Sequence, residues 1–239
     1  RIIRADLLEK NTKEWIGPES IDVYKGTDKI KIKLAEPSHL FFAGGHHYIF
    51  FRGNKLLIDF TDTDKPLIVA GNGAAGIEDG FAATGTMAAM SSSETLFGVT
   101  WFTDEQYAAI RTFDGIKLTT LSGKGSFESG YRDGTLKQSL FQRPTSLTAW
   151  GNDLYIADYY NKSLRRIMLR DSMVVKVMDY PKLSETPYKI CSSNKTLYTI
   201  NKRGDIFYSS IPDSIVLNPL ILKRLHLLPH FQNEQTTSP

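Results

Sequence analysis

A single cysteine, Cys191, occurs in the 239 residues, so no disulfide can form within this chain. The scarcity of cysteine is only a weak argument for a reducing compartment, because a chain of this length buries enough apolar surface to fold without cross-links. The longest apolar run, residues 215–231, is interrupted by Pro219, Lys223 and Arg224. It is too short and too polar to cross a bilayer, so we predict no transmembrane segment.

A strong excess of charge is also missing, since 29 Lys and Arg residues face 26 Asp and Glu residues, for a net charge of +3. Electrostatics alone therefore require neither a nucleic acid nor a membrane surface as partner. The histidines show no ligand spacing typical of a metal site, and the predicted inner strands begin with few acidic residues. We predict no catalytic residue, no metal site and no cofactor. The histidines are His39, His46, His47, His226 and His230.

The chain does contain an internal repeat. The stretch GNDLYIADYYNKSLRRI, residues 151–167, matches residues 44–60 when it is moved back by 107 positions. Moved back by 57 positions it matches residues 97–110, with Val99 opposite Ile156. Moved forward by 43 positions it matches a fourth copy that contains LYTI, residues 197–200. Self-similarity at a period near 50 residues indicates a repeat architecture.

Each copy is predicted to hold four short strands separated by Gly, Asn and Asp turns. In the third copy these strands are 146–150, 154–158, 163–168 and 173–177. Four antiparallel strands per repeat are typical of a β-propeller blade. We therefore predict an all-β chain of four-stranded blades, either a four-bladed ring or part of a six-bladed one. The four units are predicted near residues 33–70, 85–121, 142–178 and 185–222.

The third unit combines a glycine-rich loop with recurring polar and apolar positions. These are Gly123, Gly125, Gly130, Asp133-Gly134, Pro144, LYIAD at 154–158, Asn161 and LRRI at 164–167. With these residues the third unit resembles the repeats of NHL-type propellers, and the second, at residues 101–115, is similar to YWTD-type repeats. The resemblance covers roughly residues 30–210 and implies a propeller fold, but it implies no particular activity.

The flanking segments are predicted separately. Residues 1–19 are expected to form an N-terminal helical extension, residues 20–229 the propeller, and residues 230–239 a polar tail. The segment 20–26 is expected either to close the ring by pairing with the last blade or to end a preceding blade. Residues 214–222 are expected to be the outer strand of the fourth unit.

Aromatic and arginine side chains of the third unit suggest a binding surface, because such residues dominate protein interfaces. Phe102, Tyr159 and Tyr160 are predicted at the exposed loop that follows the second strand. We predict a non-enzymatic scaffold or adhesion-type platform that binds another protein of unknown identity. Two alternatives are a channel-metal enzyme of the propeller lyase or esterase type and binding of single-stranded RNA by the basic third unit. The predicted contact residues are Phe102, Tyr131, Tyr159, Tyr160, Arg165 and Arg166.

Two recurring polar features are predicted to lie in turns. Asp79 and Asp133 occupy one repeat position, where their carboxylates are expected to bond backbone N–H groups in Asx-type turns. Asn161 and Asn194 begin N-glycosylation sequons, and Asn161 is also expected to have a structural role in its turn. The sequons favour an extracellular location and the lone Cys191 an intracellular one. A cell-surface ectodomain and an intracellular scaffold are therefore both consistent with the sequence.

Overall fold

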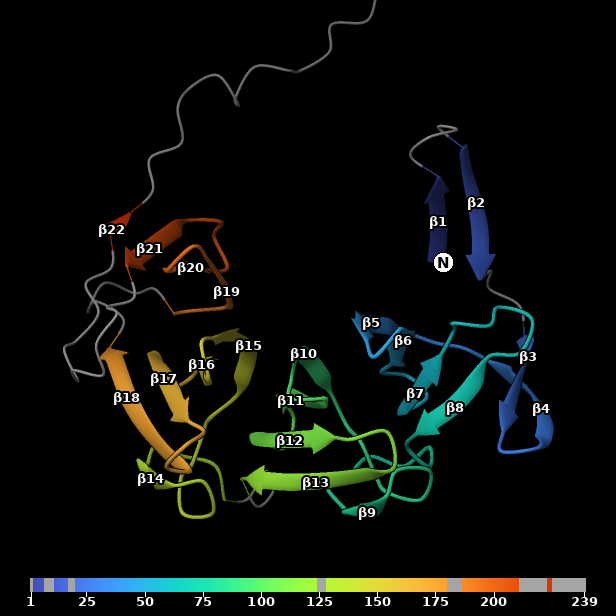
Figure 1. Ribbon diagram of the computed structural model, residues 1–239, viewed down its shortest axis with the longest axis horizontal. Helices are drawn as coiled ribbons and strands as arrows, with labels where there is room; N and C mark the ends of the chain where they lie inside the picture. The colour runs from blue at the N-terminus through green and yellow to red at the C-terminus, as the bar shows by residue number, and fades with distance from the viewer. Residues whose placement is uncertain are drawn as a thin grey trace, which may run out of the picture.

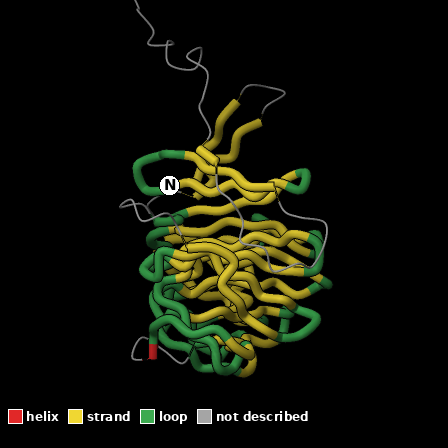
Figure 2. Tube along the Cα trace, turned by 90° about the vertical axis from the view of Figure 1, so that its left-hand side faces the viewer, coloured by secondary structure: helices red, strands yellow, loops and turns green. Residues whose placement is uncertain are grey.

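The computed structural model describes residues 2–6, 11–16, 20–123, 128–179, 186–210 and 223–224. Those residues form 22 strands in five sheets, with no α-helix among them and thus no membrane-spanning helix. Figure 1 shows four of the sheets side by side around a common centre, as an open arc of propeller blades. Figure 2 shows the same strands stacked in layers, with loops at their ends. The prediction of an all-β propeller is confirmed.

The first blade has six strands in the order β4-β3-β8-β7-β6-β5. Strand β3 joins it in parallel through the pair Tyr24 and Leu67. Residues 20–26 therefore extend the first blade, and they neither pair with the last blade nor form a separate one. The strands are β3 Ser20–Lys25, β4 Asp28–Lys33, β5 Pro37–Ala43, β6 His46–Phe51, β7 Leu56–Asp59 and β8 Leu67–Ala70.

The second and third blades share a five-stranded plan. A two-residue strand in the loop before each blade pairs with its outermost strand, β9 with β13 and β14 with β18. These short strands begin at Gly80 and Gly134, whose φ values of 126° and 138° exclude most side chains. The strands are β9 Gly80–Phe81, β10 Met90–Leu96, β11 Val99–Asp104, β12 Ala109–Phe113, β13 Lys117–Ser122, β14 Gly134–Thr135, β15 Pro144–Trp150, β16 Asp153–Asp158, β17 Ser163–Met168 and β18 Met173–Asp179.

The fourth blade comprises β19 Lys189–Ser193, β20 Thr196–Ile200, β21 Ile206–Ser210 and β22 Lys223–Arg224. The outer strand predicted at 214–222 and the tail at 230–239 lie outside the described residues. At the other end, β1 Ile2–Asp6 and β2 Asn11–Ile16 pair in an antiparallel sheet. The helix predicted for residues 1–19 is therefore wrong where the chain is described. Residues that favour strands occur in both segments, Ile in β1 and Thr, Trp and Ile in β2.

Strand register gives the true repeat distances. Pro37 pairs with Phe51 as Pro144 pairs with Asp158, which confirms the shift of 107 between the first and third blades. Met90 pairs with Asp104, so the shift between the second and third blades is 54. The predicted shift of 57 is wrong by three residues. An odd slip exchanges the two faces of a strand, and here it hid the equivalence of Asp104 and Asp158.

The core lies between consecutive blades. Apolar side chains such as Phe50, Met90 and Phe102 fill the space between the first two blades, and similar clusters follow between later ones. The innermost strands β5, β10, β15 and β19 lie next to one another in that order around the centre.

Serine hydroxyls also connect the inner strands of neighbouring blades. Ser92 accepts a hydrogen bond from Leu147 N at 3.1 Å, and Ser146 accepts one from Ile190 N at 3.2 Å. Each hydroxyl also lies within hydrogen-bonding distance of the carbonyl of the same residue. Equivalent serines thus connect the second blade to the third and the third to the fourth.

Candidate functional site

The residue that follows the second strand occupies the same end of every blade. In the first three blades its backbone N–H donates to the carbonyl oxygen of the residue just before the inner strand. The bonds are Arg52 N to Glu36 O at 2.9 Å, Glu105 N to Ala89 O at 3.2 Å, and Tyr159 N to Arg143 O at 3.1 Å. Ser146 pairs with Ala157 as Lys189 pairs with Ile200, which confirms the shift of 43 between the third and fourth blades and makes Lys202 the fourth member. The side of the arc on which the loops after the second strands lie, called this end of the arc below, therefore carries Arg52, Glu105, Tyr159 and Lys202 in blade order.

Five side chains at this end form a cluster that we call the rim cluster: Arg143, Tyr159, Tyr160, Tyr188 and Lys202. The Arg143 guanidinium lies 5.6 Å from the ring centroid of Tyr159 and 5.2 Å from that of Tyr160. It also donates a 2.9 Å hydrogen bond to Tyr160 Oη. Lys202 Nζ lies 4.7 Å from the centroid of Tyr159 and 5.1 Å from that of Tyr188. Cations and aromatic rings thus alternate from the third blade to the fourth.

The electrostatics of the rim cluster act on its tyrosines. A hydrogen bond with Thr186 lowers the pKa of the Tyr159 hydroxyl, and the hydrogen bond and charge of Lys202 lower it further. The ring of Tyr159 packs against Tyr188 in a T-shaped pair at 6.0 Å and against Tyr160 at 5.3 Å. The three rings are therefore held in fixed mutual orientation, while Tyr160 keeps 55% of its surface exposed.

The acidic member of this end is covered by basic side chains. Glu105 forms an ion pair with Arg52 at 3.3 Å and lies 4.0 Å from Arg143 Nε. Its side chain is only 13% exposed, whereas both arginines are about one-third exposed, at 38% and 33%. Within the described atoms, Arg52 Nε is a buried donor without a hydrogen-bond acceptor. The two arginines are therefore more open to solvent than the carboxylate that they share.

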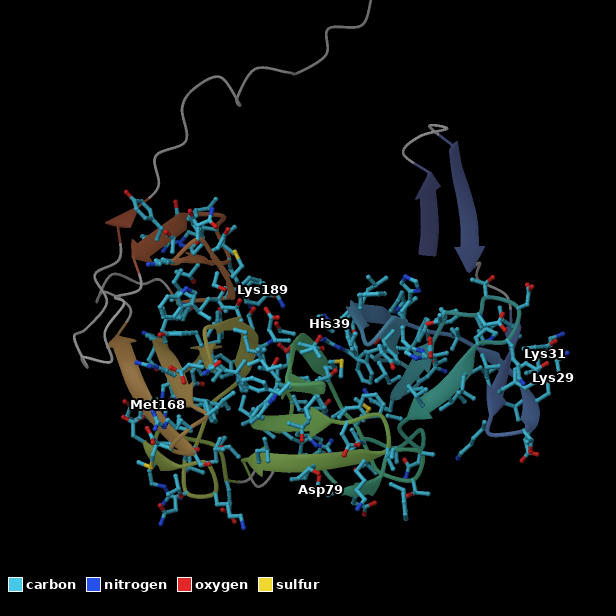
Figure 3. The ribbon with its side chains drawn as sticks, viewed as in Figure 1. Lys29, Lys31, His39, Asp79, Met168 and Lys189 are labelled. Carbon is cyan, nitrogen blue, oxygen red and sulfur yellow. The ribbon has the colours of Figure 1, made fainter. Side chains whose placement is uncertain are left out.

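The centre of the arc holds His39 and Lys189, which Figure 3 shows pointing inward from β5 and β19. Lys189 Nζ donates to Ser91 O at 2.9 Å and to Thr145 O at 3.1 Å. Burial lowers the pKa of Lys189. Burial, with a smaller effect of the Lys189 charge, lowers the pKa of His39 to about 4. The imidazole is therefore neutral at pH 7.

His39 Nε2 lies 2.9 Å from Ser93 Oγ, and the ring stacks on Phe41. Among the residues for which side chains are described, no carboxylate bonds the second ring nitrogen, so the pair lacks the group that orients a catalytic base. No group of three metal-binding side chains lies together in that part of the chain either. The channel-metal alternative consequently has no ligand set there.

Two of the predicted contact residues are buried. Phe102 is 0% exposed, because its position in β11 faces the core between the first two blades. Arg165 is also 0% exposed and lies inside the third blade. The expectation that both are exposed is wrong. In a propeller, both faces of a blade pack against neighbours, so alternation along a strand does not separate core from solvent.

Arg165 is the centre of a buried arginine cluster. It donates to Asp158 Oδ2 at 3.0 Å and to Asp133 Oδ1 at 2.7 Å. It also donates to the carbonyl oxygens of Arg132 and Leu140 in the loop that enters the third blade. Tyr131, another predicted contact residue, is 46% exposed and lies over Arg165 at 4.6 Å, outside the rim cluster.

The second blade repeats this cluster around Arg111. Its guanidinium donates to Asp79 Oδ1 at 3.2 Å and to the carbonyl oxygens of Thr86 and Glu78. Asp79 lies near the outer edge of the blade in Figure 3. It accepts a bond from Thr120 N at 2.8 Å, so it ties the loop to β13.

The recurring aspartates Asp79 and Asp133 therefore accept hydrogen bonds from buried arginines, whereas Asx-type turns were predicted. Within the clusters, burial raises the pKa values of Asp104 and Asp158, and the positive charges of Arg111 and Arg165 act in the opposite direction. The buried arginines thus tie the entry loops to their blades.

The remaining predicted residues, Arg166 and the sequon residues Asn161 and Asn194, lie outside the rim cluster. Arg166 forms an ion pair with Asp153 and takes no part in the rim cluster. Asn161 donates its amide to Gly130 O at 2.8 Å and to Asp158 Oδ2 at 2.7 Å, so this sequon nitrogen is engaged inside the protein. Asn194 is exposed in the hairpin turn between β19 and β20.

Sequence reasoning found Tyr159 and Tyr160 but missed Arg143, Tyr188 and Lys202. The signal for Lys202 was present, because the shift of 43 places it at the position of Tyr159. Arg143 and Tyr188 precede or begin the inner-strand segments of their blades, and no repeat position relates one to the other. Only the stacking of blades brings them together.

Comparisons with known proteins give the fold and no family. No family model matches the chain, and no curated protein matches it. A protein of unknown function from Bacteroides thetaiotaomicron is similar, with a TM-score of 0.54 and 15% identity over 89% of this chain. A chain of the nidogen–laminin complex has a TM-score of 0.53 and 12% identity over 87% of this chain. An auxiliary nutrient binding protein from Bacteroides ovatus has a TM-score of 0.51 and 21% identity over 73%.

These similarities support the β-propeller fold alone. This chain spans 55% of the Bacteroides thetaiotaomicron protein, 70% of the chain from the nidogen–laminin complex and 42% of the Bacteroides ovatus protein. The propeller part of the sequence resemblance is confirmed, while its assignment to NHL repeats stays a prediction.

Proposed function

We propose that this propeller is a non-enzymatic platform that binds another protein through the rim cluster. The observation that carries the proposal is a set of three tyrosines, the exposed Tyr160 and the half-buried Tyr159 and Tyr188, interleaved with Arg143 and Lys202 at one end of the arc. Tyrosine and arginine are the residues that most often dominate binding energy at protein interfaces. Here they come from the third and fourth blades, so the blades form the rigid support that such a surface needs.

The cluster is ordered before any partner arrives. The hydrogen bond from Arg143 to Tyr160 Oη and the ring contacts of Tyr159 restrict side chains that would otherwise lose rotamer freedom on binding. Restricting them in advance lowers the entropic cost of association. Such preorganisation suits recognition, and it requires no reacting group in the cluster.

The similar structures are consistent with this proposal. One similar chain belongs to a complex of nidogen with laminin, and another is described as a nutrient binding protein. By analogy, propellers of this shape serve as binding modules. The RNA alternative relied on the basic side chains of the third unit, among which Arg165 is buried and Arg166 is paired with Asp153.

A site-specific photo-crosslinking experiment tests the proposal. A benzophenone amino acid replaces Tyr160 in one sample and Phe97 in a matched control. Phe97 is 77% exposed in the hairpin turn between β10 and β11, at the opposite end of the inner strands. We expect a discrete protein adduct from position 160 in a native extract, competed by unlabelled protein, and none from position 97. Absence of an adduct at 160, or equal adducts at both positions, would contradict the proposal.

A further inference from the structure

We infer that the rim cluster recognises a carboxylate-rich peptide segment of its partner. This inference rests on the proposed function and specifies the chemistry of the bound segment.

The charges around the cluster do not balance. Four cationic side chains, Arg52, Arg143, Lys189 and Lys202, lie at or just inside this end of the arc, and Glu105 is the acid that the structure pairs with two of them. Glu105 is shared between the two arginines, so one carboxylate faces several cations. A bound anion would supply the missing counter-charge, and complementary potentials also speed and orient association.

The two outer cations retain capacity for a carboxylate. Arg143 uses one guanidinium nitrogen for Tyr160 Oη, and its Nε is 4.0 Å from Glu105. Lys202 lies over two tyrosine rings, and no acidic side chain is paired with it among the described residues. Contact with a ring face stabilises a cation but leaves its formal charge in place. A guanidinium fork and an ammonium group are both suited to carboxylate oxygens.

The spacing favours several carboxylates on one chain over a single small acid. Arg143 and Lys202 both lie against the ring of Tyr159, so acidic residues close together in one extended segment can reach both. Tyr160, with more than half its surface exposed, then offers apolar contact to the segment between the charges. An acidic peptide provides both features at once.

A single-stranded nucleic acid fits the cluster less well, although it is also anionic. Such ligands gain much of their affinity by stacking bases on open aromatic faces. The ring of Tyr159 is already covered by Arg143 and Lys202, and that of Tyr188 by Lys202 and Lys189. The arrangement therefore offers donors to a carboxylate more readily than ring faces to a base.

The experiment measures binding of three fluorescein-labelled probes by anisotropy at low and moderate salt: octaglutamate, octaglutamine and octauridylate. We expect the wild-type protein to bind octaglutamate in a salt-dependent manner and to bind octaglutamine at least tenfold more weakly. The double substitution R143Q and K202Q should weaken octaglutamate binding at least tenfold. The matched control K31Q removes an exposed charge on β4, far from Lys189 in Figure 3, and should change affinity less than twofold.

Two outcomes would overturn the inference. One is equal affinity of wild type and the double variant for octaglutamate, with both proteins showing the same thermal midpoint. The other is tighter binding of octauridylate that depends on Arg143 and Lys202, which would assign the cluster to nucleic acid. An adduct at position 160 together with either result would leave the protein platform standing and reject only the acidic segment. The converse, octaglutamate binding without any adduct, would reject the platform alone.

Discussion

The second and third blades differ from the first and fourth at one buried position on the third strand. The second and third blades place a wholly buried arginine there, and the first and fourth blades an apolar residue, although the third strand pairs with the second in the same way. The residue that ends the second strand changes in parallel. In blade order the third-strand residues are Ile58, Arg111, Arg165 and the half-buried Phe207. The residues that end the second strand, or in blade four directly follow it, are Phe51, Asp104, Asp158 and Asn201.

The loops before the blades explain this difference for the first three. The second and third blades are entered through long segments, described at residues 71–89 and 128–143, whose carbonyl oxygens accept hydrogen bonds from the buried arginines. The first blade is entered from β4 through residues 34–36 and has no such loop to hold. The propeller fold thus accepts either chemistry, and the arginine occurs where buried backbone acceptors need donors.

The largest effect is expected when the buried arginine of the third blade, Arg165, is replaced. The substitution R165M leaves Asp158 as a buried, unpaired carboxylate and should lower the free energy of unfolding by about 3–5 kcal/mol. The equivalent change in the first blade, I58V, should cost only about 1 kcal/mol, because it removes one buried methyl group. Denaturant unfolding of both variants measures the difference.

A pH series provides the control for this variant. Without the arginine, burial raises the pKa of Asp158 in the folded state above its unfolded value, so protonation favours the folded form. The deficit of R165M relative to wild type should therefore be smaller at pH 4.5 than at pH 7. A deficit that is the same at both pH values would show that lost packing, and not an unpaired charge, destabilises the variant.

How far the sequence specifies this molecule is clear from the third blade. The strand predicted at 163–168 has the bounds observed, and the others differ only at their ends, because turn residues and apolar runs are local signals. The rim cluster could not be predicted in full, since its members come from loops of two blades that meet only after stacking. The burial of Phe102 and Arg165 likewise depends on neighbouring blades.

A smaller effect is expected at the inner-strand position where the first blade has His39 and the next two have Ser92 and Ser146. The pKa of His39 is about 4 in the folded state and ordinarily 6.5. The unfolded chain therefore binds the proton more readily, and stability present above pH 6.5 is lost as the pH falls toward 4. At pH 5 the loss should be about 2 kcal/mol relative to pH 7. The variant H39S should lose that part of the pH dependence, and an unchanged pH profile would contradict the assignment.

The smallest effect is expected where the inner strands are joined by serine. The substitution S146A leaves Ile190 N without its acceptor at a buried position and should cost about 1–2 kcal/mol. The control S193A changes an exposed serine on β19 and should stay within about 0.5 kcal/mol of wild type. Equal thermal midpoints for the two variants would show that the hydroxyl bond between blades adds nothing to stability.

The position of Lys189 bears on how cooperatively the blades unfold. An array in which each unit contacts only its neighbours unfolds approximately as a sum of units and interfaces, so it can fray from one end. Lys189 belongs to the fourth blade, and its ammonium group donates hydrogen bonds to Thr145 O in the third blade and to Ser91 O in the second. Separating the fourth blade therefore breaks bonds to two blades at once and leaves buried carbonyl groups unpaired in each. This one side chain couples the melting of three successive blades into a more nearly all-or-none event.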